Sequence, residues 1–255
     1  MNLGFIGTGK IATSVITGIS KSKISYKNII ISPRNRLISK NLQKKFKKVI
    51  VANNNQEIIN KCNWVFLSVT PTVGKKIIKN LVFKPNQIVI SFISTITLAQ
   101  LKKAIKVKAQ IIRAIPLPPI SLKKGPVPIY PPNQKVKAFF DKIGTTIEIK
   151  NEKSSINFWS TSGMMAPFYQ LLSTMTDWLV KKGVKRDNAQ KYITSLFLAL
   201  SEDAVANSKK DLKYLVKESQ TLKGLNEQGV KELTKAGFYK SLEKTLNSIH
   251  KRLNK

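Results

Sequence analysis

The first twelve residues, MNLGFIGTGKIA, constrain what this chain can fold into more than any other segment. The apolar run Leu3 to Ile6 is followed by glycines and a small residue in the spacing G-x-G-x-x-A. A buried strand that breaks into glycines and then a helix is typical of a dinucleotide-binding turn, and the alternative is a glycine-rich loop of an unrelated α/β protein. In such a turn the backbone approaches a pyrophosphate, which binds the free N–H groups at the helix N-terminus. We therefore predict a helix over 10–20 and cofactor contacts from Gly7, Thr8, Gly9, Lys10, Ile11 and Ala12.

Apolar runs and amphipathic segments alternate beyond this turn as far as residue 149. The pattern predicts strands at 28–31, 49–51, 64–69, 88–93, 110–114 and 146–149. It predicts the intervening helices at 37–46, from near 56, and at 73–81, 97–105 and 135–143. Strands that alternate with helices in this way form a doubly wound parallel sheet of the Rossmann type.

The segment 116–132 has a different composition, because it holds seven of the eleven prolines. Proline lacks a backbone N–H, so it is disfavoured inside helices and central strands. We expect this segment to be non-helical and to lie at sheet edges and in turns.

From Lys153 onward the pattern is helical, with no strand. Apolar residues repeat at helical spacing from Phe168 to Leu179, Gly183 ends that helix, and Asp187 is the expected cap of the next. Further helices are expected at 211–216, 225–234 and 238–253. A half of this size cannot build an elaborate core alone, so we expect its helices to bury a face against another subunit. The predicted organisation is an α/β dinucleotide-binding domain at 1–152 and an all-α dimerisation and substrate domain at 153–255.

The segment after the second predicted strand indicates which dinucleotide binds. An acidic residue there would hold the ribose 2′-hydroxyl of NAD, whereas a basic residue accommodates the 2′-phosphate of NADP. No acidic residue occurs between Gly7 and Glu57. Ser32, Arg34 and Asn35 instead offer donors to a phosphate. We predict NADP, with NAD as the alternative cofactor and an ordinary basic surface turn as the alternative for the segment.

The charge of the chain is unusual, with 45 Lys and Arg against 13 Asp and Glu and a net charge of +32. Such an excess can indicate binding to nucleic acid or to an anionic membrane. Most of the cations are lysines spread along the chain, whereas recognition of phosphate and bases favours arginine. We therefore expect no dedicated nucleic-acid or membrane partner, although the positive field attracts anionic ligands.

The single cysteine, Cys62, excludes an intramolecular disulfide framework and a multi-cysteine metal site. We predict no metal site, a core position for Cys62 and a cytoplasmic protein. The longest strongly apolar run, 88–96, is too short to span a bilayer.

Six segments carry a family resemblance, in order and nearly end to end. They are GFIGTGKIA (4–12), VFLSVTP (65–71), SFISTITLAQL (91–101), RAIPLPP (113–119), STSGMMAPFY (160–169) and TLKGLNEQGVKELTKAGF (221–238). In these segments the chain resembles the pyrroline-5-carboxylate reductases, NAD(P)H enzymes that complete proline synthesis. The resemblance implies intertwined dimers that can assemble into a decamer. The predicted cofactor site also includes Val69, Thr70, Pro71, Ser94 and Thr95 from these segments, and Asn55 from the polar loop after the third predicted strand.

The departures from the family pattern gather in the substrate half. The family loop Ser-Pro-Gly-Gly-Thr-Thr opens a helix and holds the substrate carboxylate. Here Thr221 matches the serine and Asn226 the second threonine, but Leu222 and Lys223 replace Pro-Gly, and Leu225 replaces the first threonine. The resemblance thus supports the cofactor half better than the substrate half.

The inventory of proton donors favours an imine over a ketone as substrate. Reduction of a ketone needs a proton donor, usually His or Lys. His250 lies near the C-terminus, and no Lys or His occurs between Lys153 and Lys181. A cyclic imine can take its proton from water, so the enzyme mainly positions the substrate carbon.

We assign substrate contacts to Thr221 and Asn226, and a proton-donor role to Tyr169. A helix cap is the alternative for Thr221 and a core position the alternative for Tyr169. The sequence predicts an NADPH-dependent reductase of a cyclic imine, most specifically 1-pyrroline-5-carboxylate to proline. The alternatives are the same fold acting on a different imine or carbonyl compound, and a non-catalytic nucleotide- or polyanion-binding paralogue.

Overall fold

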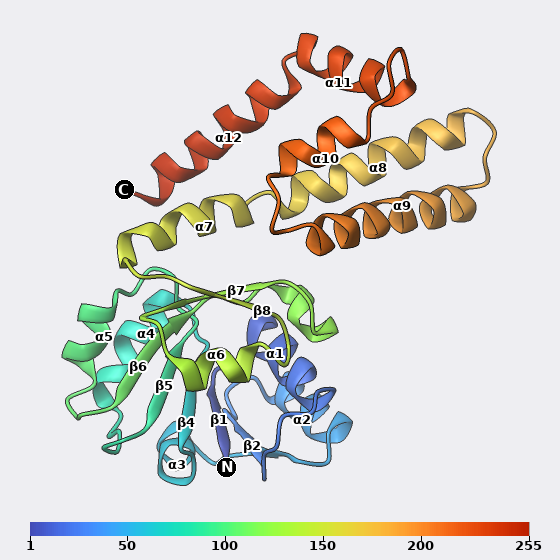
Figure 1. Ribbon diagram of the computed structural model, residues 1–255. Coiled ribbons are helices and arrows are strands. Elements are labelled where there is room, and N and C mark those ends of the chain that lie inside the picture. Colours follow the sequence, from blue (N-terminus) through green and yellow to red (C-terminus); the bar gives the residue numbers. More distant parts are fainter. Residues whose placement is uncertain (255) are drawn as a thin grey trace. The chain divides into compact units, whose positions relative to one another are not determined.

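The computed structural model describes residues 1–254, and the chain divides into two compact units, Met1–Ser155 and Ile156–Lys255 (Figure 1). We call them unit 1 and unit 2 and describe each by itself.

Unit 1 is built on one eight-stranded sheet with the strand order β3-β2-β1-β4-β5-β6-β7-β8. The strands are β1 (Leu3–Ile6), β2 (Ile29–Ile31), β3 (Val49–Val51), β4 (Trp64–Leu67), β5 (Ile88–Ser91), β6 (Gln110–Ala114), β7 (Pro126–Tyr130) and β8 (Thr145–Glu148). Every neighbouring pair is parallel except β6 and β7. The order of the first six strands is that of a dinucleotide-binding fold, so the predicted doubly wound sheet is confirmed.

Helices cover both faces of this sheet. They are α1 (Lys10–Ser20), α2 (Arg36–Lys45), α3 (Asn55–Lys61), α4 (Pro71–Ile77), α5 (Leu98–Ala104) and α6 (Gln134–Phe140), with short 3₁₀ helices η1 (Ile78–Asn80), η2 (Pro118–Leu122) and η3 (Glu152–Ser154). Helices α1, α2 and α6 share one hydrophobic cluster with the sheet, and α3, α4 and α5 share a second on the other face. Phe5 and Phe66 stack in the first cluster, with ring centroids 4.4 Å apart. Cys62 is buried in the second cluster, as predicted.

The proline-rich segment 116–132 departs from its prediction. Strand β7 is not at an edge but lies between β6 and β8. A proline removes a ladder hydrogen bond only on the side that its nitrogen faces. Pro128 faces β6, where its carbonyl oxygen accepts a bond from the Ile115 N–H. Pro126, two residues earlier in the strand, faces the same side, because successive residues of a strand bond alternately to its two neighbours. The N–H groups of Val127 and Ile129 remain available to β8.

The same segment also contains helical residues, contrary to the prediction. Pro118 and Pro119 open the 3₁₀ helix η2. At the first positions of a helix the missing N–H would have no partner in any case, so proline is tolerated there.

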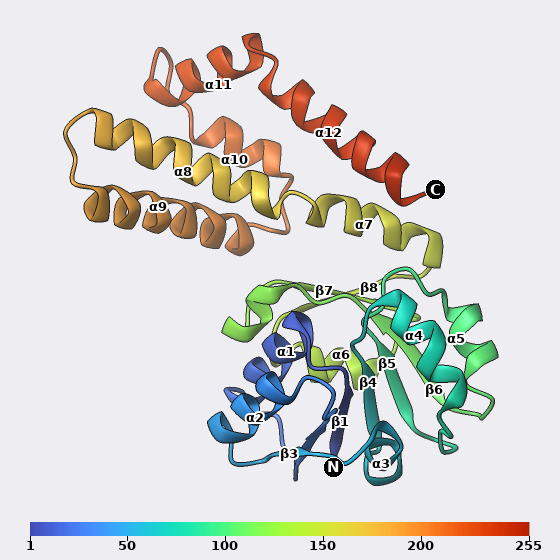
Figure 2. The same ribbon diagram turned by 180° about the vertical axis from the view of Figure 1, so that it is seen from behind.

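Unit 2 is entirely helical in the described part of the chain (Figure 2). Its helices are α7 (Ser155–Ser162), α8 (Met165–Lys181), α9 (Arg186–Ala206), α10 (Leu212–Glu218), α11 (Leu225–Lys235) and α12 (Phe238–Leu253). Helices α8 and α9 form an antiparallel pair in which Phe168 packs against Phe197, with ring centroids 5.9 Å apart. The predicted cap of α9 is wrong, because Lys185 is the N-cap and Asp187 lies in the first turn. Its charge still favours that end of the helix.

Unit 2 buries little apolar surface within the single chain. Among residues 156–254 the buried hydrophobic side chains are those of Ala189 and Ile193. Large apolar side chains are instead exposed on several helices, among them Trp178, Tyr192, Leu198, Leu200 and Val205. No helix within residues 1–254 has the length and apolar character needed to cross a membrane.

Candidate cofactor and substrate sites

The turn between β1 and α1 has the backbone that an anion-binding turn requires. Gly7 has φ +100°, and a Cβ there would lie 2.2 Å from the Ser68 carbonyl oxygen, so only glycine fits. Gly9 is the N-cap of α1, where no side chain caps the helix, and a Cβ on it would meet nothing within 4 Å. Space therefore lies open in front of the uncapped N–H groups of α1. Of the predicted contacts in this turn, Thr8 and Ala12 are buried and Lys10 is exposed.

A cavity of about 650 Å³ adjoins this turn. It is lined by Gly7, Thr8, Gly9, Arg34, Asn35, Arg36, Ser68, Val69, Thr70 and Val73. Two arginines and no carboxylate line it, and the first turn of α1 carries no acidic residue. Positive charge, backbone donors and the positive end of a helix dipole together fit an anionic dinucleotide.

The structure brings Ser32, Asn55 and Gly7 together, but in a way that the sequence did not predict. The Ser32 hydroxyl accepts a bond from the Gly7 N–H at 3.0 Å and donates to Asn55 Oδ1 at 2.5 Å. Ser32 is buried. Its hydroxyl thus ties the glycine turn to the end of β2 and the start of α3.

The basic segment after β2 lies at the rim of the cavity. Arg34 is exposed, and Asn35 caps α2 by accepting a bond from the Ile38 N–H at 3.2 Å. The structure adds Arg36, Ser68 and Val73 to the predicted lining. The two arginines belong to the same basic run, which was the available signal for Arg36. No sequence pattern of their own marks Ser68 and Val73. They line the cavity because the chain passes it as it runs from β4 into α4.

The remaining predicted cofactor residues lie at the carboxyl ends of β4 and β5. Thr70 is the N-cap of α4 and Pro71 its first residue, and Pro71 is not among the residues lining the cavity. Ser94 and Thr95 lie on the loop after β5 and are also not among the lining residues. The Ser94 carbonyl accepts a bond from Arg113 Nη2 at 2.5 Å.

The two residues predicted to bind the substrate carboxylate lie at the start of α11: Thr221 in the turn before the helix and Asn226 as its second residue. The Cβ of an alanine at Gly224 would lie 2.2 Å from Thr221 Oγ1, so the hydroxyl rests directly against the helix start. Thr221 is not the cap of α11, because Gly224 is the N-cap and no side chain caps it. The Asn226 side chain donates to the Ser219 carbonyl at 2.7 Å.

Glu227, which the sequence did not single out, is an acidic group beside this turn. Its Oε1 accepts from Lys231 Nζ and its Oε2 from the Lys223 N–H, at 2.7 and 2.6 Å. These bonds, the one to Lys231 above all, lower the pKa of Glu227. Lys223 itself has φ +62°, a left-handed backbone at a position where the resembling family has glycine.

A cavity of about 430 Å³ lies beside this turn and is lined by Lys213, Val216, Lys217, Gln220, Thr221, Leu222 and Glu227. Asn226 and Tyr169 are not among these residues. Tyr169 lies on α8, is 57% exposed and has its ring centroid 5.7 Å from that of Phe168. Its predicted alternative, a core position within the chain, is therefore wrong. His250 bonds to Asn157 at 3.0 Å and links α12 to α7.

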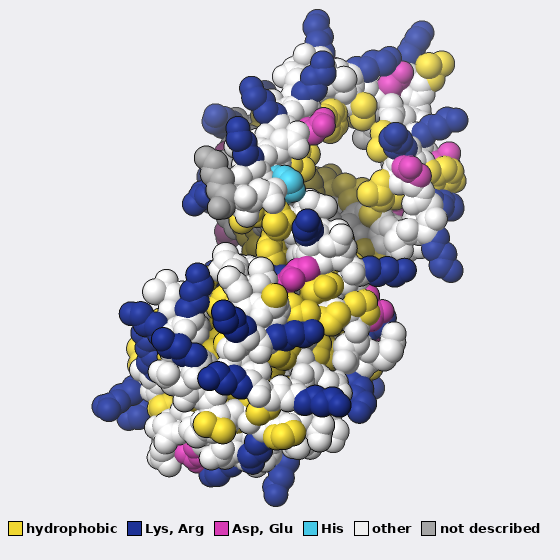
Figure 3. All heavy atoms as spheres, turned by 90° about the vertical axis from the view of Figure 1, so that its left-hand side faces the viewer, with side chains coloured by type: hydrophobic (Ala, Val, Ile, Leu, Met, Phe, Trp, Pro, Cys, Tyr) yellow, Lys and Arg dark blue, Asp and Glu magenta, His cyan; other side chains and the backbone are white. Residues whose placement is uncertain are grey.

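Positive charge is distributed over the surface. In the face shown in Figure 3, Lys and Arg side chains are scattered over the surface, and acidic side chains are few. The net charge of +32 thus provides a broad positive field.

Comparison with known proteins matches a family model in each unit. Residues 2–95 match the model described as NADP oxidoreductase, coenzyme F420-dependent, and residues 157–255 match that of pyrroline-5-carboxylate reductase dimerisation. The chain is also 24% identical to a pyrroline-5-carboxylate reductase of Pseudomonas aeruginosa, over 98% of this chain and 94% of that protein.

Solved structures resemble both units. A pyrroline-5-carboxylate reductase from Coxiella burnetii has a TM-score of 0.85 at 19% identity, with 99% of this chain and 97% of that chain covered. A pyrroline carboxylate reductase from Plasmodium falciparum with NADP bound has a TM-score of 0.80 at 18% identity, with the same coverage. At these identities the likeness establishes the fold. The NADP oxidoreductase model agrees with NADP as the predicted cofactor.

Proposed function

Because the chain belongs to the pyrroline-5-carboxylate reductase family, we propose that it is an NADPH-dependent reductase that converts 1-pyrroline-5-carboxylate to proline. The observation that carries this proposal is the open, uncapped N-terminus of α1 behind a glycine turn, in a cavity lined by two arginines. We keep 1–152 and 153–255 as the cofactor and dimerisation domains of this enzyme.

The cofactor half of the proposal assigns roles along unit 1. The N–H groups of the turn from Gly7 to Ala12 would hold the pyrophosphate, and Arg34 and Asn35 the 2′-phosphate. Ser32 and Asn55 would support the turn, since they bond each other and Gly7. Val69, Thr70 and Pro71 after β4 and Ser94 and Thr95 after β5 would border the nicotinamide.

The substrate half assigns the carboxylate to the start of α11. Thr221 and Asn226 would bind it, aided by the uncapped N-terminus of this eleven-residue helix. Lys213 and Lys217 line the adjoining cavity, and Lys231 pairs with Glu227, so positive charge exceeds negative charge around the turn. This balance favours a carboxylated substrate.

The chemistry requires little of the protein beyond orientation. Bound NADPH would supply a hydride to the carbon of the C=N bond, and the imine nitrogen can be protonated by water beforehand. Tyr169 is the proposed donor if the protein does supply a proton. The side chain of His250 is engaged with Asn157, in line with a structural role.

A different imine or carbonyl substrate is the second candidate, and the substrate turn favours keeping it. Leu222 and Leu225 are 88% and 87% exposed in the turn, where the resembling family has proline and threonine. Apolar side chains at these positions would suit a bulkier substrate than the family's own.

The proposed assembly is a homodimer through unit 2, with a decamer as the larger form that the family resemblance implies. The match to a dimerisation model and the exposed apolar side chains of α8 and α9 support the dimer.

The direct experiment follows NADPH absorbance with 1-pyrroline-5-carboxylate, beside a panel of cyclic imines and 2-keto acids. We expect turnover of the first. Turnover of another panel member in its place would select the second candidate, and tight NADPH binding without any turnover would select a non-catalytic paralogue.

The cofactor preference is tested with Arg34→Glu. A carboxylate there would repel the 2′-phosphate, so NADPH affinity should fall much more than NADH affinity. The matched control is Lys40→Glu, an exposed residue of α2 that does not line the cavity and makes the same charge change. Equal losses for the two cofactors would show that Arg34 does not contact the phosphate.

The substrate assignment is tested with Asn226→Leu. We expect a higher KM for the carboxylated imine with NADPH affinity unchanged, because Asn226 is assigned to the carboxylate alone. An unchanged KM would remove Asn226 from the site.

A further inference from the structure

A buried arginine in unit 1 is not used by the assignments above. Arg113 lies in β6 and is 4% exposed. A buried guanidinium is costly unless it is paired and hydrogen-bonded. Burial lowers the pKa of Arg113, and the charge of Glu152 counters part of that shift. Glu152 opens η3, at the end of unit 1, and its side chain is 25% exposed.

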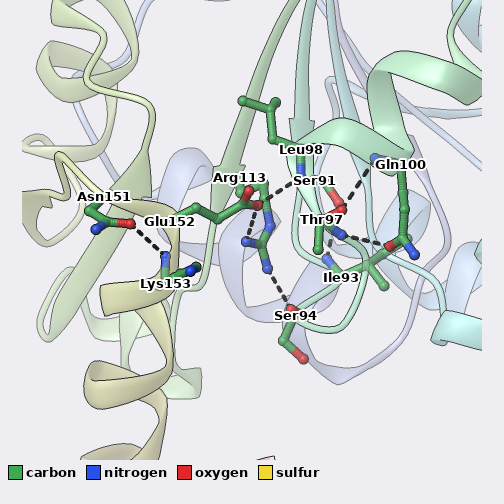
Figure 4. A network of polar contacts seen from close by, with 10 residues as sticks. All are labelled: Ser91, Ile93, Ser94, Thr97, Leu98, Gln100, Arg113, Asn151, Glu152 and Lys153. Carbon is green, nitrogen blue, oxygen red and sulfur yellow. Dashed lines mark hydrogen bonds and ion pairs between the residues drawn. The ribbon is translucent and has the colours of Figure 1, made fainter. Parts of the chain in front are cut away.

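The pair holds one loop at two points (Figure 4). Arg113 Nη1 donates to Glu152 Oε1, and Nη2 donates to the Ser94 carbonyl, each at 2.5 Å. The same Glu152 oxygen accepts from the Leu98 N–H at 2.7 Å. Leu98 is the first residue of α5, so the loop between β5 and α5 is held in its middle, at Ser94, and at its end.

This loop occupies the position where a doubly wound sheet binds its ligand. Strand β5 is parallel to β4, and their carboxyl ends lie at the same edge of the sheet. Ligands of such sheets bind outside the carboxyl ends of the strands. The loop carries Ser94 and Thr95, whereas neither Arg113 nor Glu152 lines the cavity beside the glycine turn.

We propose that Arg113 and Glu152 form a positioning pair that fixes the loop 92–97 and thereby aligns the reacting groups without contacting them. What the loop aligns rests on the proposed function. How the loop is held does not, because it follows from the contacts given above. A guanidinium suits this task because its fork offers two nitrogens in fixed directions, one for the carboxylate and one for the carbonyl. A lysine ammonium keeps the charge but does not reproduce this geometry.

The test compares Arg113→Lys and Glu152→Gln with the wild type by amide hydrogen exchange and by kinetics. We expect faster exchange at 93–98 in both variants, with protection of β5 retained. We expect kcat to fall about 10- to 100-fold while the KM for NADPH changes less than about threefold, because a misplacement of about 1 Å costs this much in rate. A role confined to stability would instead speed exchange throughout unit 1 and lower kcat only with the folded fraction.

Asp141→Asn is the matched control. The Asp141 carboxylate, directly after α6, also accepts from a cation, Lys137, and from a backbone N–H, that of Thr146, but both partners lie outside the loop 92–97. Its loss should leave the exchange at 93–98 and kcat unchanged.

The outcomes separate this inference from the proposed function. If the wild type turns over no imine, only the proposed function is overturned. The positioning role would still be tested, since it predicts that NADPH slows amide exchange at 93–98 in the wild type but not in Arg113→Lys. Unchanged exchange at 93–98 in both variants would overturn the positioning role. A loosened loop with unchanged kcat in an active enzyme would overturn it too.

Discussion

Units 1 and 2 differ in where their apolar side chains lie. In unit 1 both faces of the sheet are covered by helices of the same unit, and residues such as Phe5 and Phe66 are fully buried. In unit 2 only Ala189 and Ile193 are buried hydrophobic residues within the described 156–254, while Trp178 is 58% exposed. Unit 1 therefore holds its fold with its own core, whereas unit 2 presents the apolar surface that an assembly would cover. Three experiments break or sharpen this comparison.

The largest effect is expected in the closed core of unit 1. Phe66→Ala removes a ring that stacks on Phe5 and should cost about 3–5 kcal/mol of unfolding free energy. Urea unfolding followed at several protein concentrations measures it, and the loss should not depend on concentration. Leu37→Ala, at a 72% exposed position of α2, is the control and should stay within about 0.5 kcal/mol of the wild type. A loss below about 1 kcal/mol for Phe66→Ala would mean that this core is not what holds unit 1.

The next effect concerns the exposed surface of unit 2. Leu200→Asp and Leu198→Asp each place a charge on α9 where 55% and 58% of a leucine is exposed. If a second copy covers these positions, the dissociation constant of the assembly should rise at least about tenfold. Sedimentation of dilution series measures it, with Leu37→Asp of unit 1 as the control that leaves assembly unchanged. An unchanged dissociation constant for both α9 variants would show that this surface is not an interface.

The smallest effect is a pH dependence of the unfolding free energy. It arises in unit 1, where Cys62, the single cysteine of the chain, lies. Burial raises the pKa of the Cys62 thiol from 9.0 to about 12. The unfolded chain then loses this proton at lower pH than the folded one, so stability is present below about pH 9 and is lost as pH rises toward 12. The loss at pH 10 is about 1.4 kcal/mol. Unfolding free energies of the wild type and Cys62→Ala are measured at pH 8 and pH 10. The stability advantage of the wild type over Cys62→Ala should be smaller at pH 10 by this amount, and an equal difference at both pH values would contradict the burial of the thiol.

The elements that the sequence predicted best are those with strong local signals. The bounds of α1, β3, β6 and α12 agree with prediction, because glycines, apolar runs and helical spacing mark them directly. The prediction for β7 is wrong because a proline disrupts a sheet only on the side that its nitrogen faces. Which neighbouring strand lies on that side is set by the assembled sheet and cannot be read from the local sequence. The predicted cap at Asp187 is two residues too late, because Lys185 ends the connection without a capping side chain.

The candidate site was less completely predictable. The glycine turn and Arg34 follow from spacing and charge, and they line one cavity. Ser32 could not be recognised as a support for Gly7, because that bond joins two strands through space. The Arg113–Glu152 pair was missed for the same reason, since 39 residues separate its members. Whether Thr221, Asn226 and Tyr169 meet a substrate stays a prediction.

The most direct test of the central claim, that the glycine turn holds NADP, is the NADPH dissociation constant of Gly9→Ser. Gly9 has φ −71°, and its Cβ would meet nothing within 4 Å, so serine fits the fold and is a favoured N-cap. The added hydroxyl would occupy the N–H groups of α1 that the pyrophosphate needs. We expect Tm within about 2 °C of the wild type and a dissociation constant at least about tenfold higher, which corresponds to about 1.4 kcal/mol. An unchanged dissociation constant in a variant of unchanged Tm would contradict the claim.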